Sequence, residues 1–175
     1  MVSKKKIQTR QYLFLPRRKV PITGEELDFL YDAAVEHKQE ATPSRSNHLL
    51  KVRTIRDKGK VSWGCKADFN EISTLLLTDE LRDLYLELTD HLNVIQFNYM
   101  TINNFIRPHT DRSRDSPLGC VLGLTDNYRG GQLHFTNGPM LRVGRGDLLM
   151  IRPPREHKVY EVTSGEKITI AYWIA

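Results

Sequence analysis

The chain has 175 residues, of which 39% are hydrophobic, and this length allows one domain with an apolar core. Two cysteines, Cys65 and Cys120, cannot build a disulfide framework, and no apolar run approaches the roughly 20 residues of a membrane span. The N-terminal segment also lacks the apolar core of a signal peptide. We therefore expect an intracellular protein, cytoplasmic or nuclear, that does not associate with a membrane.

The net charge of +5 is unevenly distributed. Residues 1–60 carry 14 lysines and arginines against seven acidic residues, whereas residues 61–93 carry two against seven. A basic N-terminal portion is suited to attract an anion such as a nucleic-acid backbone, and a solvated basic tail is the alternative interpretation.

The first half of the chain predicts two strand regions and two helices. Residues 7–15 are rich in β-branched and aromatic side chains and predict a strand. Thr23-Gly-Glu-Glu26 has the form of a capping box and predicts a helix that ends near His37. Residues 49–63 read as irregular strands, and residues 79–92 carry leucines at helical spacing, which predicts a second helix.

From residue 94 onward the pattern becomes strand-like, with glycine-rich turns between short apolar runs. The predicted strands are residues 94–101, 106–109, 119–124, 132–135, 140–143, 147–151, 157–162 and 167–174. Eight short strands that close on themselves suit a jelly roll. We expect a mainly β fold with flanking helices (α+β), in which residues 1–175 form one domain. Residues 94–175 would form the jelly-roll core, and residues 1–93 would supply supporting strands and helices on one outer face of the larger sheet.

Three side chains in this half could share a metal ion. His109 and Asp111 are two residues apart, so an extended strand points both side chains to the same side. His157 follows another apolar run and can supply a third ligand. Two imidazoles and one carboxylate that leave coordination positions open are typical of non-heme Fe(II) oxygenases.

The ordered set His109, Asp111, His157 and Lys167 resembles the Fe(II)/2-oxoglutarate dioxygenase superfamily, and the resemblance covers about residues 94–175. It implies a double-stranded β-helix, an Fe(II) ion, 2-oxoglutarate as cosubstrate, O2 and, as a supporting reductant, ascorbate. In such enzymes, oxidation of 2-oxoglutarate to succinate and carbon dioxide is coupled to hydroxylation of a C–H bond.

The same resemblance implies that Lys167 binds the distal carboxylate of 2-oxoglutarate. Alternation along the last predicted strand puts Thr169 beside Lys167, where its hydroxyl can be a further donor. We expect Asn98 and Tyr99 to make additional polar contacts with the cosubstrate. A lysine that reaches solvent from the end of a strand is the alternative.

Two branches of the superfamily compete for the substrate. The segment Tyr128-Arg-Gly-Gly-Gln-Leu133 is similar to the TET/JBP branch, which oxidises methyl groups of pyrimidine bases in DNA, whereas Lys167 resembles the residue that prolyl hydroxylases use. Arginines flank the predicted ligands and would suit phosphates; these are Arg107, Arg112, Arg114, Arg152 and Arg155.

An extruded base also calls for aromatic residues at the mouth of the pocket, for which Tyr128 and Phe105 are candidates. The first hypothesis is thus oxidation of a pyrimidine methyl group in DNA. The alternatives are hydroxylation of a prolyl or other peptide residue and, from a different class, a non-catalytic jelly-roll binding module. The sequence leaves the oligomeric state open.

Overall fold

The computed structural model describes residues 12–44, 51–56, 69–85, 92–111, 118–152 and 155–174. Three predicted elements therefore fall partly outside the described residues, namely the strand at residues 7–15, the irregular strands at residues 49–63 and the helix at residues 79–92.

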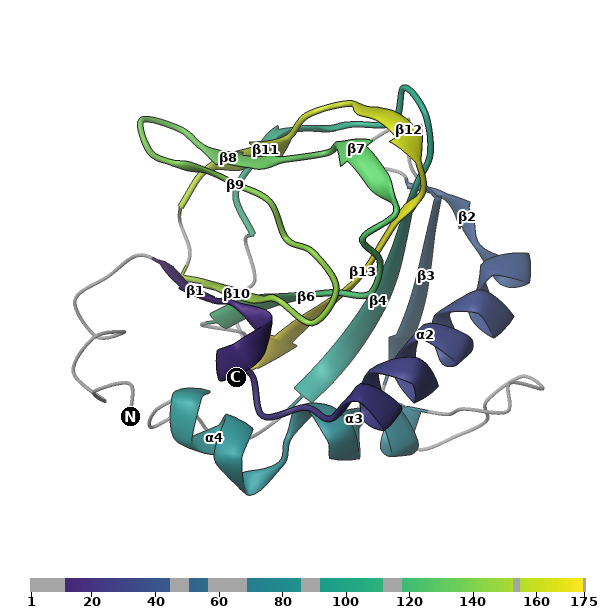
Figure 1. The fold of residues 1–175 in the computed structure, drawn as a ribbon, viewed down its shortest axis with the longest axis vertical. Coiled ribbons are helices and arrows are strands. Elements are labelled where there is room, and N and C mark those ends of the chain that lie inside the picture. Colours follow the sequence, from purple (N-terminus) through teal and green to yellow (C-terminus); the bar gives the residue numbers. More distant parts are fainter. Residues whose placement is uncertain are drawn as a thin grey trace.

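The larger of two facing β-sheets has seven strands in the order β1-β10-β6-β13-β4-β3-β2 (Figure 1). In that order the strands are Tyr12–Leu15, Leu148–Ile151, Leu118–Gly123, Lys167–Ile174, Leu92–Met100, Lys51–Arg56 and Thr42–Pro43. The last strand, β13, lies at the centre, antiparallel to β4 on one side and to β6 on the other. β13 is therefore paired along both of its edges, as an inner strand of the sheet.

The smaller sheet faces the larger one and has four strands in the order β5-β11-β8-β9 (Figure 1). They are Ile106–His109, His157–Val159, Leu133–Phe135 and Met140–Leu141. A further pair joins β7 (Tyr128–Gly130) to β12 (Val162–Gly165). One apolar cluster, which includes Phe135, Leu149 and Ile151, fills the space between the sheets.

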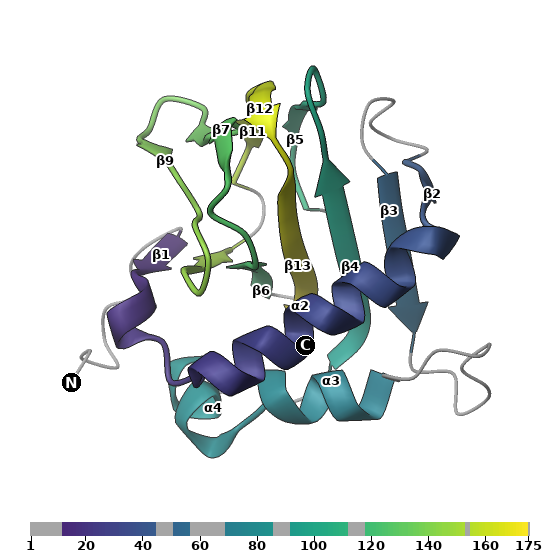
Figure 2. The same ribbon diagram turned by 45° about the vertical axis from the view of Figure 1, so that its right-hand side comes forward.

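Three helices cover the outer face of the larger sheet, as expected (Figure 2). They are α2 (Gly24–His37), α3 (Phe69–Leu76) and α4 (Asp79–Tyr85), and two short 3-10 helices, η1 (Arg17–Lys19) and η2 (Lys38–Glu40), flank α2. Leu30 of α2, Ile72 of α3 and Leu81 of α4 belong to the same buried cluster as Phe97 of the sheet. The sequence analysis did not predict α3, although Ile72, Leu75 and Leu76 have helical spacing.

All eight strands predicted after residue 94 are present, with ends that differ by a few residues. The strands β7 and β12 were not predicted, because a segment of three or four residues around a glycine turn carries too little alternation to be recognised. The sequence analysis likewise predicted no strand at β2. None of the helices among the described residues is long and apolar enough to cross a membrane.

The capping box at the start of α2 gives a test of the local structure. The Thr23 hydroxyl accepts from the Glu26 amide at 3.1 Å, and the Thr23 amide donates to Glu26 Oε2 at 2.7 Å. Replacing Thr23→Ala removes the first of these bonds, so we expect the free energy of unfolding in urea to fall by about 1 kcal/mol. Thr23→Ser keeps the acceptor hydroxyl and should change the free energy of unfolding by only a few tenths of that amount. Equal losses of stability in both variants would contradict the capping role of Thr23.

Candidate metal centre and cosubstrate cavity

The three predicted ligands meet at one end of the smaller sheet. His109 is the last residue of β5 and is the cross-strand partner of His157, the first residue of β11. Asp111 follows β5 and turns one oxygen toward each ring, with Oδ1 3.6 Å from His109 Nε2 and Oδ2 3.9 Å from His157 Nε2. One ligand atom from each of the three side chains lies within 4.8 Å of the other two.

Each histidine is oriented by its own strand. The Nδ1–H of His109 donates to the Arg107 carbonyl at 2.8 Å, and that of His157 donates to the Arg155 carbonyl at 3.0 Å. A carbonyl oxygen can only accept, so the Nδ1 atom carries the proton and Nε2 keeps its lone pair. Both free nitrogens therefore face the Asp111 carboxylate, as metal-ligating histidines held by backbone carbonyls do.

This donor set fits a divalent transition metal. Donors that share one ion at about 2.0–2.2 Å lie at most about 4.4 Å apart, which accommodates the two measured separations. Burial, the largest effect on His157, lowers the pKa of its ring below the ordinary value and keeps the imidazole neutral. A neutral imidazole is the form that binds a metal.

A cavity of about 200 Å³ connects the three ligands with Lys167, which is only 3% exposed. Lys167 starts β13, and its Nζ donates to the Gly131 carbonyl at 2.6 Å. Burial, assisted by the positive charge of Arg142, lowers the Lys167 pKa to about 7. The lysine thus does not reach solvent, and it presents a cation or a strong donor to the cavity.

The turn that receives Lys167 requires glycine. Gly130 and Gly131 both have positive φ, at 73° and 65°. A Cβ on Gly131 would lie 3.2 Å from Lys167 Cδ, and one on Gly130 would lie 2.2 Å from the Glu161 carbonyl oxygen. The Gly-Gly pair therefore brings a backbone carbonyl close enough to bind the buried ammonium.

A row of polar side chains continues from Lys167 along the cavity wall. Thr169 is the cross-strand partner of Asn98, and the Asn98 amide donates to Thr169 Oγ1 at 3.3 Å. Gln96, two residues before Asn98 on β4, donates to Asn98 Oδ1 at 2.6 Å. These three side chains and Lys167 all line the cavity, so a small polar molecule there would meet several hydrogen-bonding groups.

The structure corrects two predicted contacts. Tyr99 points away from the cavity, because side chains alternate along β4 and Asn98 faces inward. Its hydroxyl donates to the Ala34 carbonyl in α2, and its ring belongs to the cluster under the helices. Tyr128 is 4% exposed, donates to the Val143 carbonyl at 2.7 Å and packs in the core between the sheets. Neither side chain is placed to touch a molecule in the cavity.

The three predicted arginines that the structure describes do not surround a single opening. Arg107 is exposed on the outer face of the smaller sheet. Arg155 lies over the ring of Phe135, 5.4 Å from its centroid, and Arg152 is half-buried. Arg112 and Arg114 lie outside the described residues.

Other cavity residues were not predicted as site residues. Gln96 and Trp173 line the cavity because they share strand faces with Asn98 and Lys167, a signal that alternation in the sequence does carry. The Gly131 carbonyl could not have been predicted in this way, because a backbone acceptor has no side-chain signature.

The family comparison agrees with this geometry. A family model described as the 2OG-Fe(II) oxygenase superfamily matches residues 95–175, which include the three ligands and Lys167. No curated protein matches the chain.

Several solved structures share the fold at low identity. An oxidoreductase of the 2OG-Fe(II) oxygenase family from Burkholderia pseudomallei is 17% identical with a TM-score of 0.78, over 98% of this chain and 88% of that one. A Pseudomonas putida prolyl-4-hydroxylase is 20% identical with a TM-score of 0.71, over 98% and 95% of the two chains. A Trichoplax adhaerens prolyl hydroxylase, solved with a hypoxia inducible factor peptide, is 13% identical with a TM-score of 0.75, over 98% and 86%.

These likenesses confirm the double-stranded β-helix fold that the sequence predicted. With the His-Asp-His cluster, the family match also sets aside the hypothesis of a non-catalytic binding module. The family model of the 2OG-Fe(II) oxygenase superfamily thus matches the part of the chain that holds the predicted site, residues 95–175, and this match together with the His-Asp-His cluster supports a dioxygenase that uses Fe(II) and 2-oxoglutarate.

Proposed function

We propose that this dioxygenase hydroxylates a residue of a peptide or protein substrate, with proline as the first candidate. In this proposal His109, Asp111 and His157 hold the iron, and Lys167, Thr169 and Asn98 hold the distal carboxylate of 2-oxoglutarate. The bound iron and cosubstrate supply the oxidising chemistry, and the protein positions the substrate and excludes water.

The observation that carries the choice of a peptide over DNA is the position of Tyr128. An enzyme that extrudes a base needs an aromatic side chain free to stack on it. The Tyr128 ring is instead buried, with the Arg142 guanidinium 4.3 Å from its centroid. Phe105, the other aromatic candidate, is half-buried and does not line the metal cavity. The resemblance of residues 128–133 to the DNA-oxidising branch is therefore explained by core packing and by the glycine turn at Lys167.

Two further facts support a peptide substrate. Among the described residues that line the cavity, Lys167 is the one lysine or arginine, and a lysine there resembles the prolyl hydroxylases. The chain also aligns with 95% of the Pseudomonas putida prolyl-4-hydroxylase, so it has room for a comparable structural core.

Oxidation of a pyrimidine methyl group in DNA is the second candidate. The observation that favours it is the exposed Arg107, which lies two residues before the predicted ligand His109 on the outer face of the same sheet, since arginine binds phosphate through paired hydrogen bonds.

The metal assignment predicts the effect of removing the carboxylate. Asp111→Ala leaves two histidines and should weaken Mn(II) binding about 100-fold or more, measured by electron paramagnetic resonance titration. Asp83→Ala, which removes an exposed carboxylate of α4, is the matched control and should bind Mn(II) as the wild type does. Equal affinities in the two variants, with circular dichroism unchanged, would exclude Asp111 as a ligand.

The buried lysine predicts how cosubstrate affinity depends on pH. The carboxylate binds the ammonium form, and the free protein has a Lys167 pKa of about 7. Above pH 7 binding must take up a proton, so the Kd for 2-oxoglutarate in the Mn(II)-loaded protein should rise by up to about tenfold per pH unit between pH 7 and 9. Isothermal titration calorimetry in buffers of different ionisation enthalpy measures both the Kd and the proton uptake.

Two variants separate this effect from a general loss of structure. Lys167→Met should bind 2-oxoglutarate weakly, with no proton uptake over the same pH range. Lys167→Arg keeps its charge throughout, so whatever affinity it retains should not fall as the pH rises. A wild-type Kd that is constant from pH 7 to 9 would contradict the lowered Lys167 pKa. A Lys167→Met variant that binds 2-oxoglutarate as tightly as the wild type would contradict the anchoring role of Lys167.

The choice of substrate is tested with parallel reactions. The Fe(II)-loaded protein is incubated with 2-oxoglutarate and ascorbate, together with proline-containing peptides or with DNA that contains thymine and 5-methylcytosine. We expect peptides that gain the mass of one oxygen, with succinate formed in equal amount and neither product formed by Asp111→Ala. Oxidised bases in the DNA, without any change in the peptides, would replace the proposal by the second candidate.

A further inference from the structure

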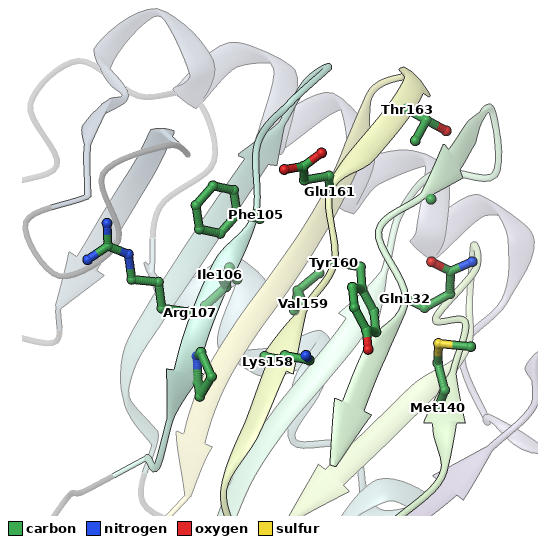
Figure 3. A pocket seen from close by; sticks show the side chains of 12 residues that line it. Phe105, Ile106, Arg107, Gln132, Met140, Lys158, Val159, Tyr160, Glu161 and Thr163 are labelled. Carbon is green, nitrogen blue, oxygen red and sulfur yellow. The ribbon is translucent and has the colours of Figure 1, made fainter. Parts of the chain in front are cut away.

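A groove of about 800 Å³ runs over the smaller sheet (Figure 3). Since side chains alternate along β11, Lys158 in this groove points to the opposite side of the sheet from the predicted ligand His157, so the groove lies on the outer face. The groove is formed by β5, β11 and the segment that follows β11. Gln132 and Met140 lie on the side of the groove that is farther from β5 (Figure 3). A volume of this size is typical of sites that bind a ligand or a short segment of chain.

The groove and the metal cavity share part of their walls. Ile106 of β5 and Val159 of β11 line both of them. His109 pairs with His157 and Ile106 pairs with Val159, so two residues of β5 lie opposite Lys158 alone. This β-bulge lies directly beside both ligand histidines, where bulges commonly redirect side chains near active sites.

The groove exposes apolar side-chain surface, and the contact of this surface with water is unfavourable. Met140 is 56% exposed and Tyr160 is 38% exposed, and both line the groove. The Tyr160 ring is held in place, since Lys158 Nζ lies 4.4 Å from its centroid and its hydroxyl lies 3.1 Å from His134 Nδ1. A fixed aromatic surface loses little side-chain freedom when a partner binds it.

Charges of opposite sign occupy different parts of the groove. Arg107 and Lys158 lie at the bulge near the metal ligands, whereas Glu161 lies toward the other end (Figure 3). A nucleic-acid strand would need cations along its whole path. A groove with cations at one end, a carboxylate at the other and apolar side chains between them is better matched to a polypeptide.

We propose that this groove docks the segment of the peptide substrate that flanks the hydroxylated residue. An acidic side chain of that segment pairs with Lys158 and Arg107, and an apolar side chain packs on Met140 and Tyr160. The proposal rests on the proposed peptide substrate and specifies its chemistry. The target residue enters the metal cavity while the acidic and apolar flank lies on the outer face of the same sheet.

The test compares synthetic peptides of 12 residues with a central proline and either acidic or basic flanks, together with a proline tripeptide. With the Fe(II)-loaded full chain, kcat/KM should be about fivefold or more higher for the acidic than for the basic peptide. Lys158→Glu should reverse that preference. We divide kcat/KM for the acidic peptide by kcat/KM for the tripeptide, and Met140→Ser should reduce this ratio. The control variant Val35→Ser alters a similarly exposed apolar side chain on α2 and should leave the ratio unchanged.

The outcomes separate the two proposals. Hydroxylation of peptides regardless of their flanks, or a preference that survives in both groove variants, overturns the docking groove and leaves the peptide hydroxylase standing. If no peptide is hydroxylated, the proposed function fails and the groove proposal fails with it. A wild-type dimer in sedimentation that Met140→Ser dissociates would assign the groove to a second copy of the chain and overturn the proposal.

Discussion

The pairing of β4 with β13 at the centre of the larger sheet is the constraint on which the rest of the site depends. Its register is unbroken from Lys167↔Met100 to Trp173↔Val94, so the inward or outward direction of every side chain on both strands is fixed. Because successive side chains point to opposite faces, the row that starts at Lys167 lines the cavity and the row that starts at Ile168 packs under the helices. If the pairing of β13 with β4 shifted by one residue, apolar side chains would line the cavity and Lys167 would point toward the helices. The helices that pack on the outer face oppose such a shift, because it would place polar side chains against them.

The three predicted metal ligands depend on a different kind of support. Each histidine is oriented from within its own strand, by the carbonyl two residues earlier, and the antiparallel pairing of β5 with β11 then brings the two rings together. Local geometry thus sets the direction of each imidazole, and the sheet sets the distance between them. This separation of roles explains how ligands from distant parts of the chain form one cluster on a short four-stranded sheet.

Much of this arrangement could be predicted from the sequence, and the failures have physical reasons. Alternating apolar residues predicted the strands after residue 94, and the faces of β13 followed from the same pattern. Tyr99 was mistaken because adjacent residues of one strand cannot both face the cavity. Tyr128 was mistaken because a sequence does not tell whether an aromatic ring is packed in the core or stands at a pocket mouth.

The Gly131 carbonyl gives the cavity a property that no single side chain could provide. It holds the Lys167 Nζ in position, so in its proposed role the lysine would present an aligned donor to the carboxylate of the cosubstrate. Lys167 also lies 5.8 Å from the centre of the Tyr128 ring, which further limits its freedom. With Lys167 as the proposed anchor, an arriving cosubstrate needs no rearrangement of this part of the cavity wall, which lowers the free-energy cost of binding.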